Sequence, residues 1–184
     1  MADSPRSTGL ASTGFDWIAR RRDLLSGAGL LLGALALPGS RARAQGKFEL
    51  PAETRTALDQ RALVYVSPLL ASGKESRCHA EIWYFMDGGD VIVGTSPTRW
   101  KGVAAKKGRG ARVWVTGSDS ETDYRKGRTF ATSAKIDTDP ATFQRLLASF
   151  AKKYPGEWGK WEPRFKKSYG DGSRVLIRYA PTAA

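Results

Sequence analysis

Residues 77–101 read RCHAEIWYFMDGGDVIVGTSPTRWK and contain the clearest structural signals of the chain. Its first part, residues 77–86, is aromatic and β-branched, and both of its alternating sets of residues contain large apolar side chains, which is typical of a central strand. Asp87-Gly88-Gly89-Asp90 indicates a tight hairpin turn. Residues 90–95 predict the returning strand. We therefore expect a protein built on antiparallel β-structure.

The segment after this hairpin predicts a helix over residues 97–107. Ser96 is a suitable N-cap, Pro97 suits the first helical position, and Gly108 follows the last turn. The signals at the two ends of the segment therefore agree.

Further strand patterns lie before and after this stretch, at residues 62–67, 112–116, 128–136 and 174–180. A helix is predicted at 51–61, and another after Asp139-Pro140, where apolar residues recur at helical spacing. Residues 155–170 show no period and predict a loop or lid. The whole pattern predicts a mainly β, α+β protein: a six-stranded barrel with two or three flanking helices.

The composition is that of one folded unit with a large basic excess. The chain has 184 residues, 41% of them hydrophobic, and a formal net charge of +12. Because it has one Cys and one His, an intrachain disulfide and a zinc site made of Cys and His are excluded. The charge first suggests a nucleic acid or an anionic surface as partner.

The first 44 residues predict a twin-arginine (Tat) signal peptide, because Arg20-Arg21-Arg22 precedes a mildly apolar run. The run 26–37 is too short for a stable membrane span, and 42–44 suits signal peptidase. Removing residues 1–44 lowers the formal charge to +9. We expect recognition by the Tat export machinery and a periplasmic protein, which argues against nucleic acid. The expected organisation is 1–44 signal, 45–60 N-terminal segment and helix, and 61–184 barrel domain.

Over about residues 61–181 the order of elements resembles the split β-barrel of the pyridoxamine-5′-phosphate-oxidase-like superfamily, which includes deazaflavin-dependent reductases. The resemblance is most specific in the stretch 77–101, and the closing strand near 175–182 adds to it. It implies a six-stranded antiparallel split β-barrel, a homodimer, and FMN or deazaflavin F420 as cofactor. It also implies hydride transfer to or from a small-molecule substrate.

The end of the second hairpin strand predicts a phosphate site. Thr95, Ser96 and Thr98 supply hydroxyl groups, and Arg99 and Lys101 supply positive charge. Basic residues at a helix start oppose the helix dipole, a cost that a bound phosphate would offset. The resemblance adds Arg77, a basic residue that is expected on the preceding strand. The alternative is that Ser96 only caps the helix while the cations are solvated. The candidate cofactor-binding residues are Arg77, Thr95, Ser96, Arg99, Trp100 and Lys101.

Other chemistry-bearing residues have simpler interpretations. Trp83 and Trp114 are expected in the core, whereas Trp100 is the candidate for ring contact. Cys78 is expected to be buried, and His79 shares a face with Glu81, which would orient it.

A non-catalytic periplasmic binding protein for an anionic ligand, haem or a cell-envelope surface is the alternative function. It is suggested by cations and aromatic residues that interleave over 152–169. The Gly-rich segment of deazaflavin reductases is missing here, which favours FMN, and a chain that has lost its cofactor remains an alternative.

Overall fold

The computed structural model describes residues 48–118 and 123–183. The predicted signal peptide at 1–44 lies outside the described residues and stays a prediction. Within the described part, no helix is long and apolar enough to cross a membrane.

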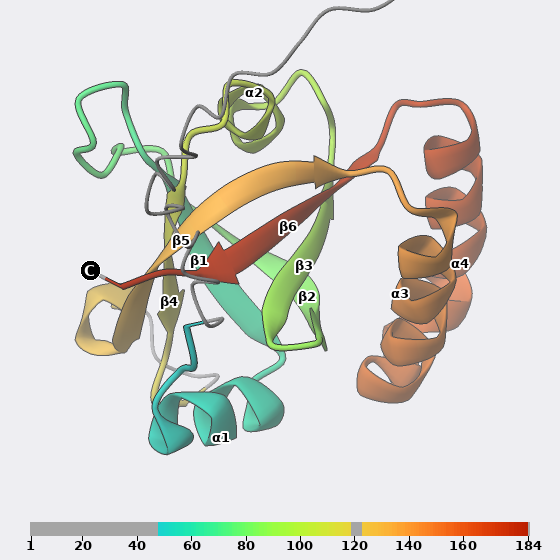
Figure 1. Cartoon of the computed structure of the whole chain (residues 1–184). Coiled ribbons are helices and arrows are strands. Elements are labelled where there is room, and N and C mark those ends of the chain that lie inside the picture. Colours follow the sequence, from blue (N-terminus) through green and yellow to red (C-terminus); the bar gives the residue numbers. More distant parts are fainter. Residues whose placement is uncertain (1–47, 119–122, 184) are drawn as a thin grey trace, which may run out of the picture. The chain divides into compact units, whose positions relative to one another are not determined.

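Six antiparallel strands close into a barrel in the order β1-β2-β3-β6-β5-β4, with β4 pairing back onto β1. This confirms the predicted six-stranded antiparallel barrel (Figure 1). The strands are β1 (Leu63–Pro68), β2 (Ala80–Asp87), β3 (Asp90–Thr95), β4 (Ala111–Val115), β5 (Arg128–Asp137) and β6 (Val175–Pro181).

The β2–β3 hairpin forms where the sequence predicts it. Asp87 pairs with Asp90, and the two residues between them, Gly88 and Gly89, have φ angles of 58° and 90°. A two-residue turn of this kind needs positive φ at both positions, which glycine adopts without a steric cost.

The barrel interior is filled by alternate residues of the strands, such as Val64, Val91 and Tyr179, all at most 1% exposed. Helix α1 (Ala52–Gln60) and helix α2 (Trp100–Lys106) lie at opposite ends of the barrel (Figure 1). Leu58 from α1 and Ala105 from α2 belong to the same apolar cluster as the strand residues. The two helices therefore close the two ends of one core.

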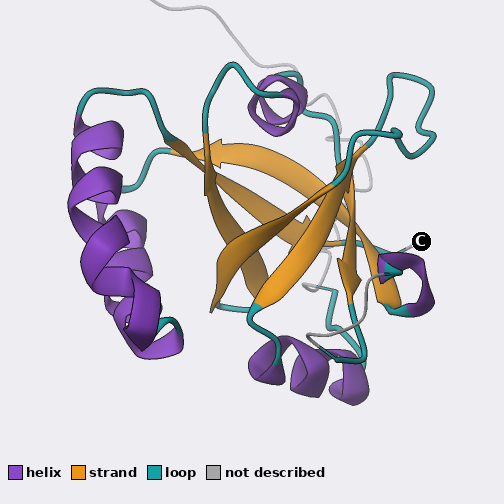
Figure 2. Ribbon diagram, turned by 180° about the vertical axis from the view of Figure 1, so that it is seen from behind, coloured by secondary structure: helices purple, strands orange, loops and turns teal. Residues whose placement is uncertain are grey.

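A second core lies outside the barrel, where helices α3 (Pro140–Lys153) and α4 (Pro155–Gly170) pack beside it (Figure 2). Phe85, Ile92 and Leu176 from the strands contact Phe150 and Phe165 from the helices in this cluster. The outward faces of β2, β3 and β6 are therefore buried as well, which explains their nearly continuous apolar sequences.

Helix α4 shows that the loop predicted at 155–170 is wrong. Trp158, Trp161 and Phe165 recur at helical spacing, but Pro163 and the glycines in the segment hide the pattern. Packing of the buried Trp158 and Phe165 against α3 and the barrel outweighs the low helix propensity of Pro163 and the glycines.

Two predicted boundaries also move. Helix α2 begins at Trp100 with Arg99 as N-cap, so Ser96 does not cap it; the Ser96 hydroxyl instead lies 3.0 Å from the Thr98 hydroxyl. Strand β2 begins at Ala80, so Arg77 lies in the loop before it rather than on the strand.

Ion pairs tie the hairpin to the rest of the barrel. The guanidinium of Arg178 on β6 lies 2.6 Å from Asp87, 3.0 Å from Asp90 and 2.7 Å from Asp137 (N to O). Burial alone would lower the pKa of Arg178, but the hydrogen bonds to these three carboxylates raise it above the ordinary value.

Candidate cofactor site

A corner forms where the turn after β3 enters α2 and meets the loop between β1 and β2. The indole Nε1 of Trp100 donates a hydrogen bond to the hydroxyl of Ser76, at 3.3 Å. This contact brings Arg77, the next residue, beside the start of α2. We call the four cations Arg77, Arg99, Lys101 and Arg109, together with Trp100, the cationic corner.

Lys101 is the most unusual member of the cationic corner, because it is only 8% exposed. Burial lowers its pKa, since the charged ammonium is removed from water. Among the described residues, no hydrogen bond or ion pair reaches the Lys101 ammonium. The electrostatic influence of Cys78 opposes this lowering of the pKa, and an anion at this point would favour the charged ammonium further.

The other cations of the corner also lack acidic partners. Arg109 lies over the indole of Trp100, with its guanidinium carbon 5.9 Å from the ring centroid. Arg77 and Arg99 are exposed. No carboxylate in the described part of the chain forms an ion pair with any of the three arginines.

The structure thus brings five of the six predicted residues to one place. Thr95 is the partial exception: it pairs with Val175, and by alternation along β3 its side chain shares the inward face of Val91 and Val93. Arg109 is a further member that the sequence does not single out, since it stands in a basic turn after Gly108.

Cys78 and His79 differ from expectation. Cys78 is exposed rather than buried, because it lies in the loop before β2. The ring of His79 lies 4.4 Å from that of Tyr124, and its Nδ1 is 3.2 Å from the carbonyl of Arg77. Glu81 does not orient His79; it accepts a hydrogen bond from Tyr65 at 3.1 Å.

Trp83 and Trp114 are half-buried. Trp83 stacks on Tyr154 with 4.4 Å between ring centroids, as part of the second core. Trp114 donates a hydrogen bond to Glu75 at 3.0 Å.

An aromatic cavity of about 430 Å³ lies on the outer side of the barrel under α4. Arg174, which the sequence analysis missed, points its guanidinium over Phe165 at 4.2 Å and donates to the carbonyl of Gly94 at 3.1 Å. No local pattern marks Arg174: its side chain also bonds the nearby Ser168 hydroxyl at 3.1 Å, but its contact with Gly94 joins segments 80 residues apart. The residues that line the cavity are Leu63, Glu81, Ile82, Trp83, Gly94, Trp161, Phe165 and Arg174.

Comparison with known proteins gives likeness in structure only. No model of a protein family matches the sequence, and no curated protein matches it. HutZ from Vibrio cholerae, described as a heme storage protein, matches with 13% identity and a TM-score of 0.52, over 74% of this chain and 93% of HutZ. The conserved hypothetical protein Rv2991 from Mycobacterium tuberculosis matches with 16% identity and a TM-score of 0.53, over 74% and 83% of the two chains.

A proposed pyridoxamine 5′-phosphate oxidase from Listeria innocua matches with 13% identity and a TM-score of 0.48, over 71% of this chain and 92% of that one. Strand order, barrel closure and the likeness to HutZ and Rv2991 agree on the architecture. The chain therefore shares the fold of these two proteins, a closed six-stranded antiparallel β-barrel with flanking helices, which is the architecture that the resemblance to the pyridoxamine-5′-phosphate-oxidase-like superfamily implies.

Proposed function

We propose that this protein is an oxidoreductase that binds a flavin, FMN or deazaflavin F420, with the flavin phosphate in the cationic corner. The observation that carries the proposal is Lys101, a largely buried lysine whose ammonium makes no hydrogen bond or ion pair with the described residues. A phosphate would supply the missing negative charge and accept charge-assisted hydrogen bonds.

The other residues present fit a phosphate. Arg77 and Arg99 add charge from two segments that Trp100 and Ser76 hold together. The hydroxyls of Ser96 and Thr98 lie 3.0 Å apart and would complete the hydrogen bonding. This fit rests on side chains and does not rely on the dipole of the short helix α2.

A bound flavin supplies hydride transfer, so no side chain need act as acid or base. The role of this chain is to bind and orient the flavin and to shield it from water. The aromatic cavity includes Gly94, which immediately precedes Thr95, so a flat ring or a small-molecule substrate would lie against Trp83 and Trp161. Arg174 would orient a negatively charged group there.

Haem is the second cofactor to weigh, because HutZ is described as a heme storage protein. Haem iron is held by a His, Cys, Met or Tyr side chain. The side chains that line the aromatic cavity, a cavity beside α1 and a third beside Trp114 include no His, Cys, Met or Tyr, and the ring of His79 packs on Tyr124. These observations favour flavin over haem.

We further propose that the protein is exported by the Tat pathway and acts in the periplasm as a homodimer. The paired arginines and the apolar run near residues 20–37 support export. A folded domain that acquires a flavin before export would suit that route.

The experiment is purification of the full chain from a Tat-competent host, followed by visible spectroscopy and FMN titration. We expect the two visible absorption bands of oxidised flavin, and mass spectrometry of the released group separates FMN from F420. Lys101→Met should weaken FMN binding at least tenfold, which corresponds to about 1.4 kcal/mol. Lys106→Met is the matched control, because Lys106 is exposed on the same helix.

Two results would overturn the proposal. A Soret band, or colourless protein that does not bind added FMN, would return the alternative of haem or a non-catalytic binding protein. Unchanged FMN affinity in a folded Lys101→Met variant would remove the phosphate from the cationic corner.

A further inference from the structure

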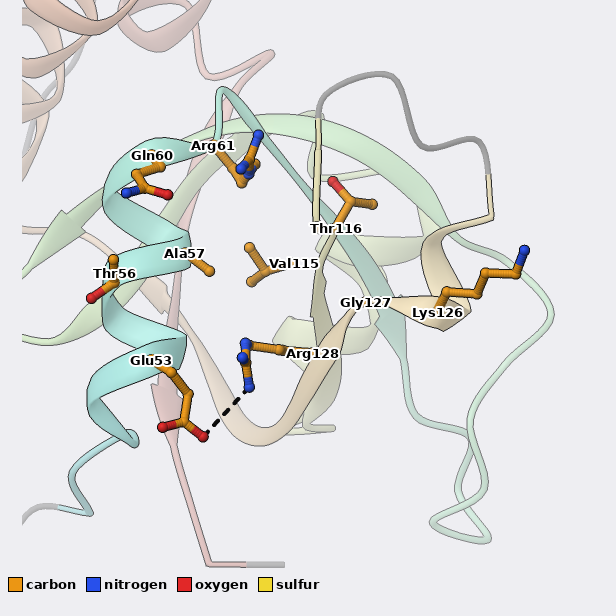
Figure 3. A pocket seen from close by; sticks show the side chains of 11 residues that line it. Glu53, Thr56, Ala57, Gln60, Arg61, Val115, Thr116, Lys126, Gly127 and Arg128 are labelled. Carbon is orange, nitrogen blue, oxygen red and sulfur yellow. Dashed lines mark hydrogen bonds and ion pairs between the residues drawn. The ribbon is translucent and has the colours of Figure 1, made fainter.

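A second cavity, of about 650 Å³, lies between α1 and the strands β4 and β5 (Figure 3). Because α1 and α2 close opposite ends of the barrel (Figure 1), this cavity lies away from the cationic corner. Its volume is in the usual range for small-molecule sites, about 300–1,000 Å³. The polar side chains that matter here are Thr56, Gln60, Arg61, Thr116 and Arg128.

Arg61 is held firmly at this cavity by its backbone. Its N–H donates to the carbonyl of Ala57 at 3.0 Å as α1 ends, and its own carbonyl accepts a hydrogen bond from Tyr84 at 3.0 Å. The C-terminal end of a helix favours a cation, so the Arg61 guanidinium suits its place at the end of α1.

Among residues 48–118 and 123–183, nothing pairs with the Arg61 side chain. Its Nε is shielded from solvent and makes no hydrogen bond in the described part of the chain, and no described carboxylate forms an ion pair with it. A buried donor without an acceptor carries a desolvation penalty and calls for an explanation. A ligand with an oxyanion would provide the acceptor.

Figure 3 shows how the cavity is arranged. Arg61 and Arg128 enter it at its two ends, with Ala57 and Val115 between them, whereas Lys126 points away. Arg128 is paired with Glu53 at 3.4 Å, and both of these side chains are more than half exposed. Arg61 is therefore the cation that remains for a ligand.

We propose that this cavity binds a small polyhydroxylated organic anion, of the class of sugar phosphates, with its oxyanion on Arg61. A guanidinium offers paired donors that match a phosphate oxygen pair. Gln60 and Thr116 offer an amide and a hydroxyl group to the ligand's hydroxyls, whereas the Thr56 hydroxyl already donates to the Ala52 carbonyl at 3.0 Å.

The test is a titration of ¹⁵N-labelled full-length protein with ribose 5-phosphate, followed by NMR. We expect saturable binding with a Kd of about 1 mM or tighter, and shifts of the amide signals of residues 115–117 and 126–128. Ribose without the phosphate should bind at least tenfold more weakly.

Variants separate this site from general attraction to a basic chain. Arg61→Gln should weaken binding at least tenfold, whereas Arg55→Gln should not. Arg55 lies on the same helix, loses the same charge, pairs with Glu49 at 3.9 Å, and does not line the cavity. Ala57→Leu narrows the cavity without changing charge and should also weaken binding tenfold or more, which keeps the test valid if Arg61→Gln does not fold.

The proposal is overturned by any of three results. These are the absence of saturable binding, an equal loss in the Arg55 and Arg61 variants, and shifts confined to residues 95–101. The last result would assign the phosphate to the cationic corner instead.

Discussion

Replacing Arg178 by Met is the sharpest test of how this barrel is held together. The Arg178 guanidinium bonds three carboxylates, of which Asp137 is 8% and Asp90 6% exposed as whole residues. Methionine keeps much of the volume but removes the charge. Because Arg178 is the cation shared by these partly buried carboxylates, removing its charge should lower the free energy of unfolding at pH 7 by about 3–5 kcal/mol, although Asp87 keeps its ion pair with Arg145. Urea denaturation measures this change.

The dependence on pH gives a second, independent signature. The hydrogen bond from Arg145 and, after it, that from Arg178 lower the pKa of Asp87, although burial opposes them. Burial would raise the pKa of Asp137, but the Asp139 N–H and Arg178 outweigh it and lower that pKa. The pKa values of Asp87 and Asp137 are therefore lower in the folded state than in the unfolded state. The stability that these two groups contribute is fully present above about pH 4–5 and is lost as the pH falls through their folded pKa values.

In the Arg178→Met variant, the dependence of stability on pH should have the opposite sign. Without Arg178, the neighbouring carboxylates repel one another, so the pKa of Asp137 should rise above its unfolded value. The folded state then binds more protons than the unfolded state, and stability should increase as the pH falls from 7 towards 5. In the wild-type protein, these groups should change the stability little between pH 7 and pH 5.

The control is Lys166→Met, which removes an exposed pair with Glu162 at 2.8 Å and should cost about 0.5 kcal/mol or less. The reasoning is refuted if Arg178→Met costs less than about 1 kcal/mol, or if its stability falls on acidification as in the wild-type protein.

Three further substitutions test local features. Gly159→Ala should raise the free energy of unfolding by about 0.5–1 kcal/mol, because an added Cβ meets nothing within 4 Å in α4; a loss would contradict the helix. Gly102→Ala should destabilise by about 1–3 kcal/mol and weaken FMN binding, since its Cβ would lie 2.5 Å from the Ser96 carbonyl oxygen; unchanged thermal unfolding would show that this approach is looser. Tyr154→Phe should cost about 1–3 kcal/mol in urea denaturation, because the buried hydroxyl accepts from the Tyr84 N–H at 3.1 Å and donates to backbone carbonyls; a neutral result would mean that these groups find other partners.

Local sequence was sufficient for the elements whose signals are local. The Asp87–Asp90 turn needs positive φ at two adjacent positions, and only its two glycines offer that freely, so the hairpin could be predicted. Strand order followed from a resemblance, not from a local rule. Helix α4 was missed because Pro163 and three glycines lower its helix propensity, and the packing that outweighs them involves residues far away in sequence.

The candidate site divides in the same way. The sequence by itself determined that hydroxyls and cations gather after β3, because those residues are neighbours in the chain. It took the folded chain to place Lys101 in a largely buried position, to bring Arg109 and Arg77 beside it, and to leave the Arg61 Nε without an acceptor among the described residues at the other barrel end. The physical reason is that burial and the absence of a counter-charge depend on every segment that folds around a side chain, whereas residue type and spacing depend on one segment alone.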